Sequence, residues 1–310
     1  MRYLILGAGA LGGLFGGKLL KGGADVTFLV RPGRAAQLTR DGLVVKAQDG
    51  EIRTPVKTLQ QGELNGTYDV ILVCCKAYDL DGAMEAIAPA VGKDSAIVPL
   101  LNGVRHIDTL SKRFGLQHVV GGLTAINAAL LPDGVIQQSQ LRVSMNILGE
   151  LDGRLTPRCG AIQAALAKGG IQADVSANIM AGLWAKFFAF TTIAAIASLT
   201  RSRAGAIARS ADGVAFVSAV LDECARIASA EGFPPPPGTP DVVRGMFSQP
   251  DSTYGPSILI DMEDGRPTEG KHTIGDMAER ATRLGIAAPI LAAAVCNLQA
   301  YEINRQQTRR

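Results

Sequence analysis

The chain has 310 residues, of which 47% are hydrophobic and 19% are charged. This length suggests two domains at about 100–200 residues each, and the composition supports a buried core and argues against a disordered chain. The net charge of +3 comes from scattered Lys and Arg residues, without the basic stripe or cluster of a nucleic-acid-binding protein.

Five cysteines occur without a C-x-x-C motif or a Cys/His spacing typical of metal ligands, so we expect no metal site. The apolar N-terminus is too short for a secretory signal, which predicts a cytoplasmic protein with reduced thiols. No stretch reaches the ~18 consecutive apolar residues of a membrane span. The nearest stretch, Phe187 to Leu199, is expected to be a buried helix, and no membrane association is expected.

A glycine-rich loop follows the first predicted strand, Tyr3 to Leu6, and opens a helix predicted over Ala10 to Lys21. A G-x-G-x-x-G loop in this position is the dinucleotide-binding fingerprint. Its first glycine allows a tight turn, its second lets the backbone approach a pyrophosphate, and its third lets the helix pack on the strand. The first helical turn then holds negative charge. The predicted cofactor loop comprises Gly7, Ala8, Gly9, Ala10, Leu11 and Gly12.

Arg31 stands at the end of the second predicted strand, Asp25 to Val30. NAD-binding sites carry an acidic residue about 20 positions past the fingerprint, to bond the ribose hydroxyls. A guanidinium cannot accept those bonds, but it binds a 2′-phosphate well. The alternative is that Arg31 is only an exposed loop charge. The pattern therefore favours NADP(H) over NAD.

Two polar residues, Lys76 and Asn102, follow buried strands directly. In an open parallel sheet, ligands bind outside the carboxyl ends of the strands, where both residues are expected. The alternatives are a solvated lysine and an Asn-Gly turn. The elements predicted from residue 42 to residue 114 are two short strands over Gly42 to Val56, a strand over Tyr68 to Cys75, a helix over Leu80 to Ala90, a strand over Ser95 to Leu101 and a helix over Val104 to Phe114.

The next segment continues the mixture of strands and a helix. Partial alternation of apolar and polar residues predicts antiparallel edge strands over Gly134 to Gln138 and Leu141 to Leu148. The remaining elements expected here are a strand over Val119 to Leu123, a helix over Thr156 to Lys168 and a last strand over Ile171 to Val175.

From about Ser176 the strand signals stop, and a helix apolar nearly all round is predicted to run to Thr200. Its only charge is Lys186. This lysine either extends to water at the domain edge or lies desolvated in a cleft, with a pKa lowered enough to deliver a proton.

The later helices are separated by clear breaks. Pro267 is suited to the first turn of a helix, which puts Glu269 at a helix N-terminus; the simpler interpretation of Glu269 is a carboxylate favoured by the helix dipole. The predicted helical segments are Ser210 to Glu231, Asp241 to Phe247, two helices separated by Asp264 to Pro267, Ile274 to Leu284 and Pro289 to Arg305. The expected fold is α/β, with a Rossmann doubly wound sheet in residues 1–175 and an all-helical domain in residues 176–310.

These features together resemble the ketopantoate reductase (2-dehydropantoate 2-reductase) family over nearly the whole chain. Beyond the fingerprint, the resemblance is carried in order by Arg31, Lys76, Asn102-Gly103, Trp184-x-Lys186 and the Gly265 to Glu269 segment. It implies that NADPH binds across the fingerprint, with Arg31 on the 2′-phosphate and Lys76 and Asn102 near the ribose and nicotinamide. Asn127 falls where the family makes a later backbone contact with the cofactor.

The resemblance also implies a reaction. Hydride goes to the keto carbon of a 2-oxo acid, and Lys186 gives a proton to the developing alkoxide. Glu269 fixes that lysine or the substrate hydroxyl, Asn102 also borders the substrate, and Ser257 bonds the substrate carboxylate or hydroxyl. A cation placed where negative charge develops stabilises the transition state more than the ground state.

Three positions depart from the family pattern. Amides that line the family's substrate site are replaced by Phe190, Ala194 and Tyr254. Each lost hydrogen bond is worth about 0.5–1.5 kcal/mol. The pocket is therefore expected to be more apolar, and to suit a bulkier or more hydrophobic 2-oxo acid.

Three functions remain open at this point. The first is reduction of 2-dehydropantoate to pantoate, and the second is NADP-dependent reduction of another 2-oxo acid by a paralogue. The third is a non-catalytic NADP(H) sensor, which would need neither Lys186 nor Glu269. The expected partner is a small molecule, and the expected state is a monomer or a homodimer.

Overall fold

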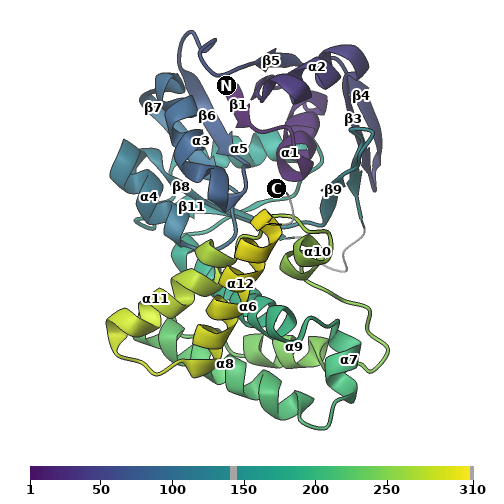
Figure 1. Cartoon of the computed structure of the whole chain (residues 1–310). Coiled ribbons are helices and arrows are strands. Elements are labelled where there is room, and N and C mark those ends of the chain that lie inside the picture. The colour runs from purple at the N-terminus through teal and green to yellow at the C-terminus, as the bar shows by residue number, and fades with distance from the viewer. Residues whose placement is uncertain (140–144, 308–310) are drawn as a thin grey trace. The chain divides into compact units, whose positions relative to one another are not determined.

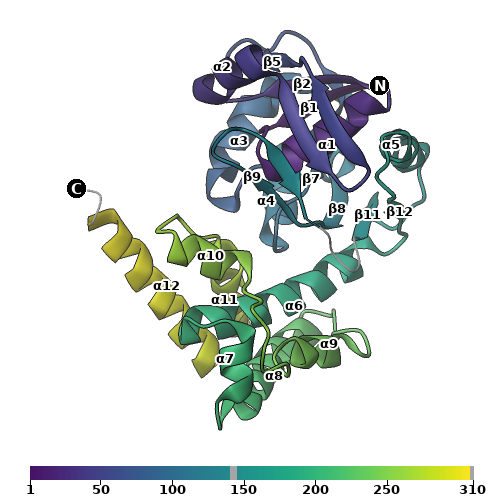
Figure 2. The ribbon, with the colours of Figure 1, turned by 90° about the vertical axis from the view of Figure 1, so that its right-hand side faces the viewer.

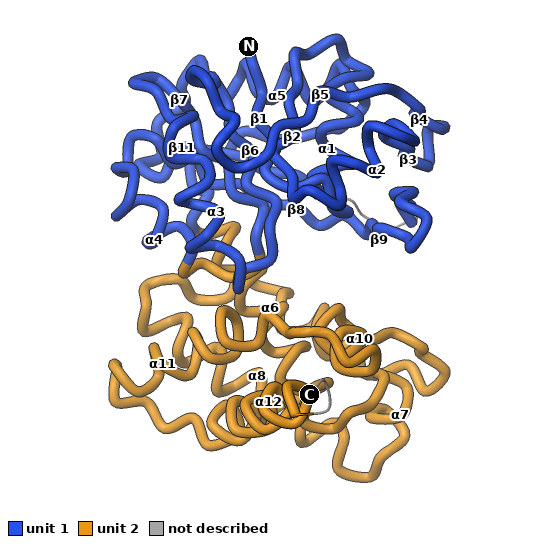
Figure 3. The backbone as a smooth tube through the Cα atoms, turned by 45° about the horizontal axis from the view of Figure 1, so that its top comes forward, with its two compact units in different colours: residues 1–101, 106–180 blue, residues 102–105, 181–310 orange. Residues whose placement is uncertain are grey.

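The computed structural model describes residues 1–139 and 145–307. Within these residues the chain forms two compact units (Figure 3). Unit 1 comprises the described residues of 1–101 and 106–180, and unit 2 those of 102–105 and 181–310. The short segment 102–105 therefore belongs with the helical unit, although only Leu100 and Leu101 separate it from a strand of unit 1.

Unit 1 is built on a five-stranded parallel sheet in the order β5-β2-β1-β6-β7 (Figure 1). Its core strands are continuous apolar runs because both faces of the sheet are covered. The strand order reverses between β1 and β6, which is where ligands of doubly wound sheets bind. The predicted Rossmann sheet is confirmed. Its strands are β1 (Arg2–Leu6), β2 (Asp25–Leu29), β5 (Lys57–Leu59), β6 (Tyr68–Val73) and β7 (Val91–Pro99).

Two smaller sheets complete unit 1. One has the order β4-β3-β10-β9 and the other the order β12-β11-β8. The strands of the first are β3 (Leu43–Ala47), β4 (Gly50–Thr54), β9 (Ala128–Leu130) and β10 (Ile136–Gln138). Those of the second are β8 (Val120–Ala125), β11 (Met145–Glu150) and β12 (Asp174–Val175).

The prediction of antiparallel edge strands over Gly134 to Gln138 and Leu141 to Leu148 is wrong in one respect. Both β10 and β11 pair on both sides, antiparallel to β9 or β8 and parallel to β3 or β12. The partner β9 has only three residues, too few to leave a sequence pattern, and of the strand predicted over Ile171 to Val175 only the two residues of β12 form. Residues 141–144 of the second predicted strand lie outside the described residues.

The helices of unit 1 are α1 (Ala10–Lys21), α2 (Pro32–Asp41), α3 (Leu80–Ile87), α4 (Arg105–Phe114) and α5 (Pro157–Lys168). The sequence analysis missed α2, because Pro32-Gly33 is typical of a turn. Pro32 instead occupies the first turn of the helix, where an N–H has no intrahelical partner to lose.

Unit 2 is helical in its described part (Figure 2). Its helices are α6 (Ile179–Thr200), α7 (Ala204–Arg209), α8 (Gly213–Ala230), α9 (Thr239–Met246), α10 (Ser257–Glu263), α11 (Ile274–Leu284) and α12 (Pro289–Gln307). α6 is long and apolar enough to cross a membrane, but 61% of its most apolar window is buried. Packing in the core of unit 2 accounts for its apolar sequence.

The helix expected to start at Pro267 does not form. Residues 266–268 have no regular secondary structure, and a short 3₁₀ turn, η4 (Gly270–His272), precedes α11. The amide of Thr268 donates to the side chain of Glu302 on α12. Glu269 is consequently the N-cap of η4 and does not lie in the first turn of an α-helix.

Candidate active site

The glycine-rich loop joins β1 to α1 at the carboxyl edge of the parallel sheet. Gly7 has a φ of +90°, and its amide donates to the carbonyl of Leu29 at the end of β2 (2.9 Å). A Cβ at Gly12 would lie 1.9 Å from the carbonyl oxygen of Gly7, so only glycine lets α1 start so close to β1. A Cβ at Gly9 would meet no protein atom within 4 Å. Gly12 is therefore required by the fold, whereas no contact within the described residues requires a glycine at position 9.

These features fit a bound dinucleotide. The open space beside Gly9 is where a pyrophosphate approaches the backbone in this type of loop. Next to it, Arg34 donates from Nε to the carbonyl oxygen of Ala8 (3.0 Å). The Nη2 of Arg34 is buried without a hydrogen-bond partner in the described chain. A buried guanidinium nitrogen whose N–H groups have no acceptor in the described chain, next to an anion-binding loop, suits a negatively charged ligand.

Arg31 is the N-cap residue of α2 and is 81% exposed. Its guanidinium pairs with Asp79, in the 3₁₀ turn η1 (Ala77–Asp79) after β6 (2.9 Å). An exposed ion pair of this kind is worth only about 0–1 kcal/mol. Little free energy is therefore lost when the Arg31 guanidinium leaves Asp79 to pair with an anion that binds it more strongly.

The other predicted cofactor residues of unit 1 lie on separate loops. Lys76 is the partly buried N-cap of η1, at the carboxyl end of β6. Asn127 is exposed between β8 and β9, and its carbonyl accepts the amide of Ser139 (2.9 Å). Ala8 is buried, while Ala10 and Leu11 are partly buried in the first turn of α1.

The helical unit brings three of the predicted residues together. Nζ of Lys186 donates to Oδ1 of Asn102 (3.1 Å), although 84 positions separate them. Burial lowers the pKa of Lys186 to about 8, while the carboxylate of Glu269, itself 6% exposed, acts in the opposite direction. A lysine of this pKa exchanges a proton near neutral pH.

The Asn102-Gly103 turn is held against the turn that carries Glu269. Gly103 has a φ of +88°, and a Cβ there would lie 2.8 Å from the carbonyl oxygen of His272. Two residues further on, Arg105 pairs with the buried carboxylate of Asp276 at the start of α11 (3.0 Å). Close backbone packing and an ion pair thus fix the position of Asn102 relative to Glu269.

The residues that replace family amides differ in accessibility. Phe190 and Ala194 follow Lys186 by one and two turns, so all three share one face of α6. Ala194 is completely buried, while Phe190 is partly exposed. Tyr254 is 40% exposed just before α10, and Ser257 is the exposed first residue of that helix.

Residue-by-residue inspection of the sequence missed several of these contacts. Gly103 was noted as part of a turn and of the family resemblance, without its contact to His272, and the contacts made by Arg34, Arg105 and Asp276 were not predicted. Arg34, three residues after Arg31 on α2, offered a weak signal, because it adds a second cation near the predicted cofactor. The pairing of Arg105 with Asp276 spans 171 positions and left no local pattern.

A Rossmann unit with an open dinucleotide loop, and a helical unit whose partly buried lysine is bonded to an amide and influenced by a carboxylate, define a dinucleotide-dependent oxidoreductase. The chain belongs to the ketopantoate reductase family. The family model described as ketopantoate reductase PanE/ApbA matches residues 3–152, and that described as its C-terminal part matches residues 178–302. The resemblance noted from the sequence is confirmed.

Individual relatives cover the chain almost completely. It is 34% identical to the uncharacterized oxidoreductase YkpB of Bacillus subtilis, over 98% of this chain and all of that protein. A 2-dehydropantoate 2-reductase structure from Geobacter metallireducens shares 27% identity with a TM-score of 0.86, covering 97% of this chain and 99% of that one. The fold also matches D-mandelate dehydrogenase bound to NADH and anilino(oxo)acetate (22% identity, TM-score 0.87, 99% of this chain and 100% of that one).

Substituting the two loop glycines is expected to separate binding from folding. Gly9→Ala should leave the stability within about 1 kcal/mol of wild type, because the new Cβ meets no protein atom. It should weaken dinucleotide binding roughly 10-fold or more, equivalent to about 1.4 kcal/mol. Gly12→Ala should destabilise the fold by about 1–3 kcal/mol, because its Cβ overlaps the carbonyl of Gly7. Urea unfolding measures the stability of each variant, and fluorescence titration measures its NADPH binding. Unaltered NADPH binding by Gly9→Ala would refute the approach of a pyrophosphate to the backbone at Gly9.

Proposed function

We propose that this protein is an NADPH-dependent reductase of a 2-oxo acid, of the 2-dehydropantoate 2-reductase type. The observation that carries the proposal is the partly buried Lys186, whose ammonium donates to Asn102 and whose pKa burial lowers against the charge of Glu269. Retention of a desolvated lysine with a lowered pKa favours catalysis over a sensor that only binds the dinucleotide.

Separate residues of this chain would bind the cofactor, donate the proton and orient the proton donor. Residues Gly7 to Gly12 of unit 1 would hold the nicotinamide dinucleotide, which supplies the hydride when bound. Lys186 would donate a proton to the carbonyl oxygen as negative charge develops on it. Asn102 would orient the ammonium through its amide oxygen, and Glu269 would help keep it charged.

The remaining predicted residues would bind the ends of the two ligands. Arg31 would exchange its exposed pairing with Asp79 for the 2′-phosphate of NADPH. Lys76 and Asn127 would lie along the cofactor, and Ser257 would bond the substrate carboxylate or hydroxyl.

A second candidate is reduction of a more apolar 2-oxo acid than 2-dehydropantoate. This alternative rests on Phe190, Ala194 and Tyr254, which replace three amides of the family pattern. Of these, Phe190 and Tyr254 keep exposed surface, whereas Ala194 is fully buried. Phe190 is partly exposed and lies on the same face of α6 as Lys186, so it would present an apolar surface to a substrate bound near that lysine.

A panel of 2-oxo acids distinguishes the candidates. kcat/KM with NADPH would be measured for 2-dehydropantoate and for 2-oxo acids with branched aliphatic and aryl side chains. Preference for the apolar acids supports the second candidate, and a dominant kcat/KM for 2-dehydropantoate overturns it. NADPH binding without turnover of any acid would instead point to the sensor.

A substitution at Phe190 adds a direct test of specificity. Phe190→Asn restores the family amide and should raise kcat/KM for 2-dehydropantoate by about 2–10-fold, the equivalent of one hydrogen bond of about 0.5–1.5 kcal/mol. Phe190→Leu is the matched control, since it reduces the side chain without adding a hydrogen-bonding group. Equal effects of both variants would mean that Phe190 acts only through its bulk.

A further inference from the structure

The segment that carries Glu269 has little regular backbone structure of its own. α10 ends at Glu263, residues 266–268 form neither helix nor strand, and η4 begins only at Gly270. A segment of this kind is held by the groups that satisfy its backbone from outside. For residues 266–270, several of these groups come from α12.

Glu302 on α12 contacts the residue directly before Glu269. One carboxylate oxygen, Oε1, accepts both the amide of Thr268 (2.8 Å) and its hydroxyl (2.9 Å). The other oxygen accepts Nε of Arg305 (2.9 Å), one turn further along α12. Thr268 is 8% exposed, so its two donors depend on a protein partner.

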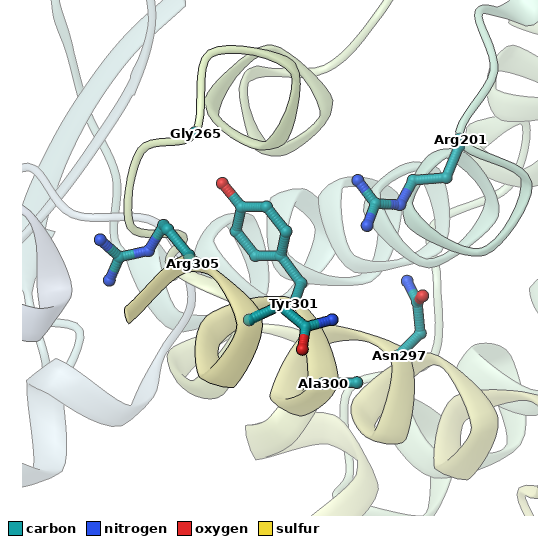
Figure 4. A pocket seen from close by; sticks show the side chains of 7 residues that line it. Arg201, Gly265, Asn297, Ala300, Tyr301 and Arg305 are labelled. Carbon is teal, nitrogen blue, oxygen red and sulfur yellow. The ribbon is translucent and has the colours of Figure 1, made fainter. Parts of the chain in front are cut away.

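Tyr301 contacts the same segment two residues earlier. Its hydroxyl lies 2.7 Å from the carbonyl oxygen of Arg266 and 3.2 Å from that of Asp261. Its ring lies beneath the guanidinium of Arg201, whose centre is 5.3 Å from the ring centroid. Figure 4 shows Tyr301 projecting from α12 toward the turn at Gly265, in a pocket that Arg201 and Arg305 also line.

The backbone after Glu269 is packed against the same helix. A Cβ at Gly270 would lie 2.6 Å from Cδ1 of Leu298, one turn before Glu302. The carbonyl of Glu269 itself accepts the hydroxyl of the fully buried Thr273 (3.0 Å). Contacts with α12 therefore lie on both sides of Glu269 along the chain.

We propose that Glu302 and Tyr301 are positioning residues, which hold the Arg266 to Thr268 segment so that the Glu269 carboxylate stays beside Lys186 and Asn102. This inference rests on the proposed function, because it gives the C-terminal helix a task in the same reaction. Neither residue is assigned contact with substrate or cofactor.

The primary test compares two substitutions of Glu302. Glu302→Ala removes the acceptor for both Thr268 donors, so kcat for 2-oxo acid reduction should fall roughly 10-fold with KM for NADPH unchanged; an error of about 1 Å costs up to about 10²-fold in rate. Glu302→Gln keeps an oxygen able to accept both bonds and should restore most of kcat. Wild-type kcat in Glu302→Ala would overturn the proposal.

Glu223 provides a matched control at the other end of α12. Its buried carboxylate accepts the amides of Ile290 and Leu291 (both 3.0 Å), so it also anchors α12 but does not contact the Glu269 segment. Glu223→Ala should lower Tm and leave kcat unchanged. If Glu223→Ala and Glu302→Ala lose kcat equally, Glu302 only stabilises the helix and the proposal fails.

A titration of Lys186 separates this proposal from the proposed function. With ¹³C-labelled lysine, NMR should give Lys186 a lower pKa in Glu302→Ala than in wild type, because the Glu269 charge that raises it has moved away. Tyr301→Phe should cause a smaller shift in the same direction, and it replaces Glu302→Ala if that variant does not fold. No shift in either variant overturns the positioning role, whereas a wild type that reduces no 2-oxo acid overturns the function and leaves this measurement valid.

Discussion

Lys186→Ala is expected to lower kcat/KM for 2-oxo acid reduction by about 10²-fold or more, with NADPH binding unchanged. That loss is the scale of a single general acid. Lys186 is the candidate because it is partly buried, its ammonium donates to Asn102 (3.1 Å), and the charge of Glu269 acts on it. Steady-state kinetics and a fluorescence titration with NADPH measure the two quantities separately.

Lys271 is the matched control for this substitution. It lies two residues after Glu269, and its side chain is exposed. Lys271→Ala should retain wild-type kcat/KM. If Lys186→Ala keeps more than about a tenth of the wild-type rate, Lys186 is not the proton donor, since general-acid contributions start at about 10²-fold.

The pH profile supplies an independent check on the same lysine. A proton donor must be protonated, so kcat/KM for reduction should fall as the pH rises through about 8, the pKa of Lys186. Because Glu269 raises that pKa, Glu269→Gln should move this alkaline limb to lower pH. A limb that stays in place would mean that Glu269 does not act on Lys186.

Arg31→Ala should raise KM for NADPH by about 10–100-fold and leave KM for NADH nearly unchanged. The magnitude corresponds to loss of a hydrogen bond to a charged group, about 1.5–3 kcal/mol. The effect is confined to NADPH because only that cofactor carries a 2′-phosphate. Initial rates with both cofactors at a saturating concentration of the 2-oxo acid give the two constants.

Arg40 is a suitable control on the same helix. It is an exposed arginine near the end of α2, paired with Asp41 (2.7 Å) as Arg31 is paired with Asp79 (2.9 Å). Arg40→Ala should change neither KM. Equal rises of both constants in Arg31→Ala would argue against a role on the 2′-phosphate, and would indicate damage to the loop as a whole.

The sequence alone determined the order of the elements around the cofactor loop and the class of fold. The strand, the glycine pattern and α1 are local, so the residues from Tyr3 to Lys21 carried their own signal. The apolar runs of β6 and α6 likewise predicted burial from composition alone. Local spacing and periodicity were sufficient to predict each element whose structure depends mainly on its own residues.

Only the tertiary structure decided how distant residues combine. Where a helix was predicted from Pro267, the chain is irregular and Thr268 bonds Glu302, 34 positions away; the bond from Lys186 to Asn102 spans 84 positions. The central place of β10 depended on β9, a partner of three residues that is too short to leave a pattern. Contacts between residues far apart in the chain depend on three-dimensional packing, which no local pattern of residue types encodes.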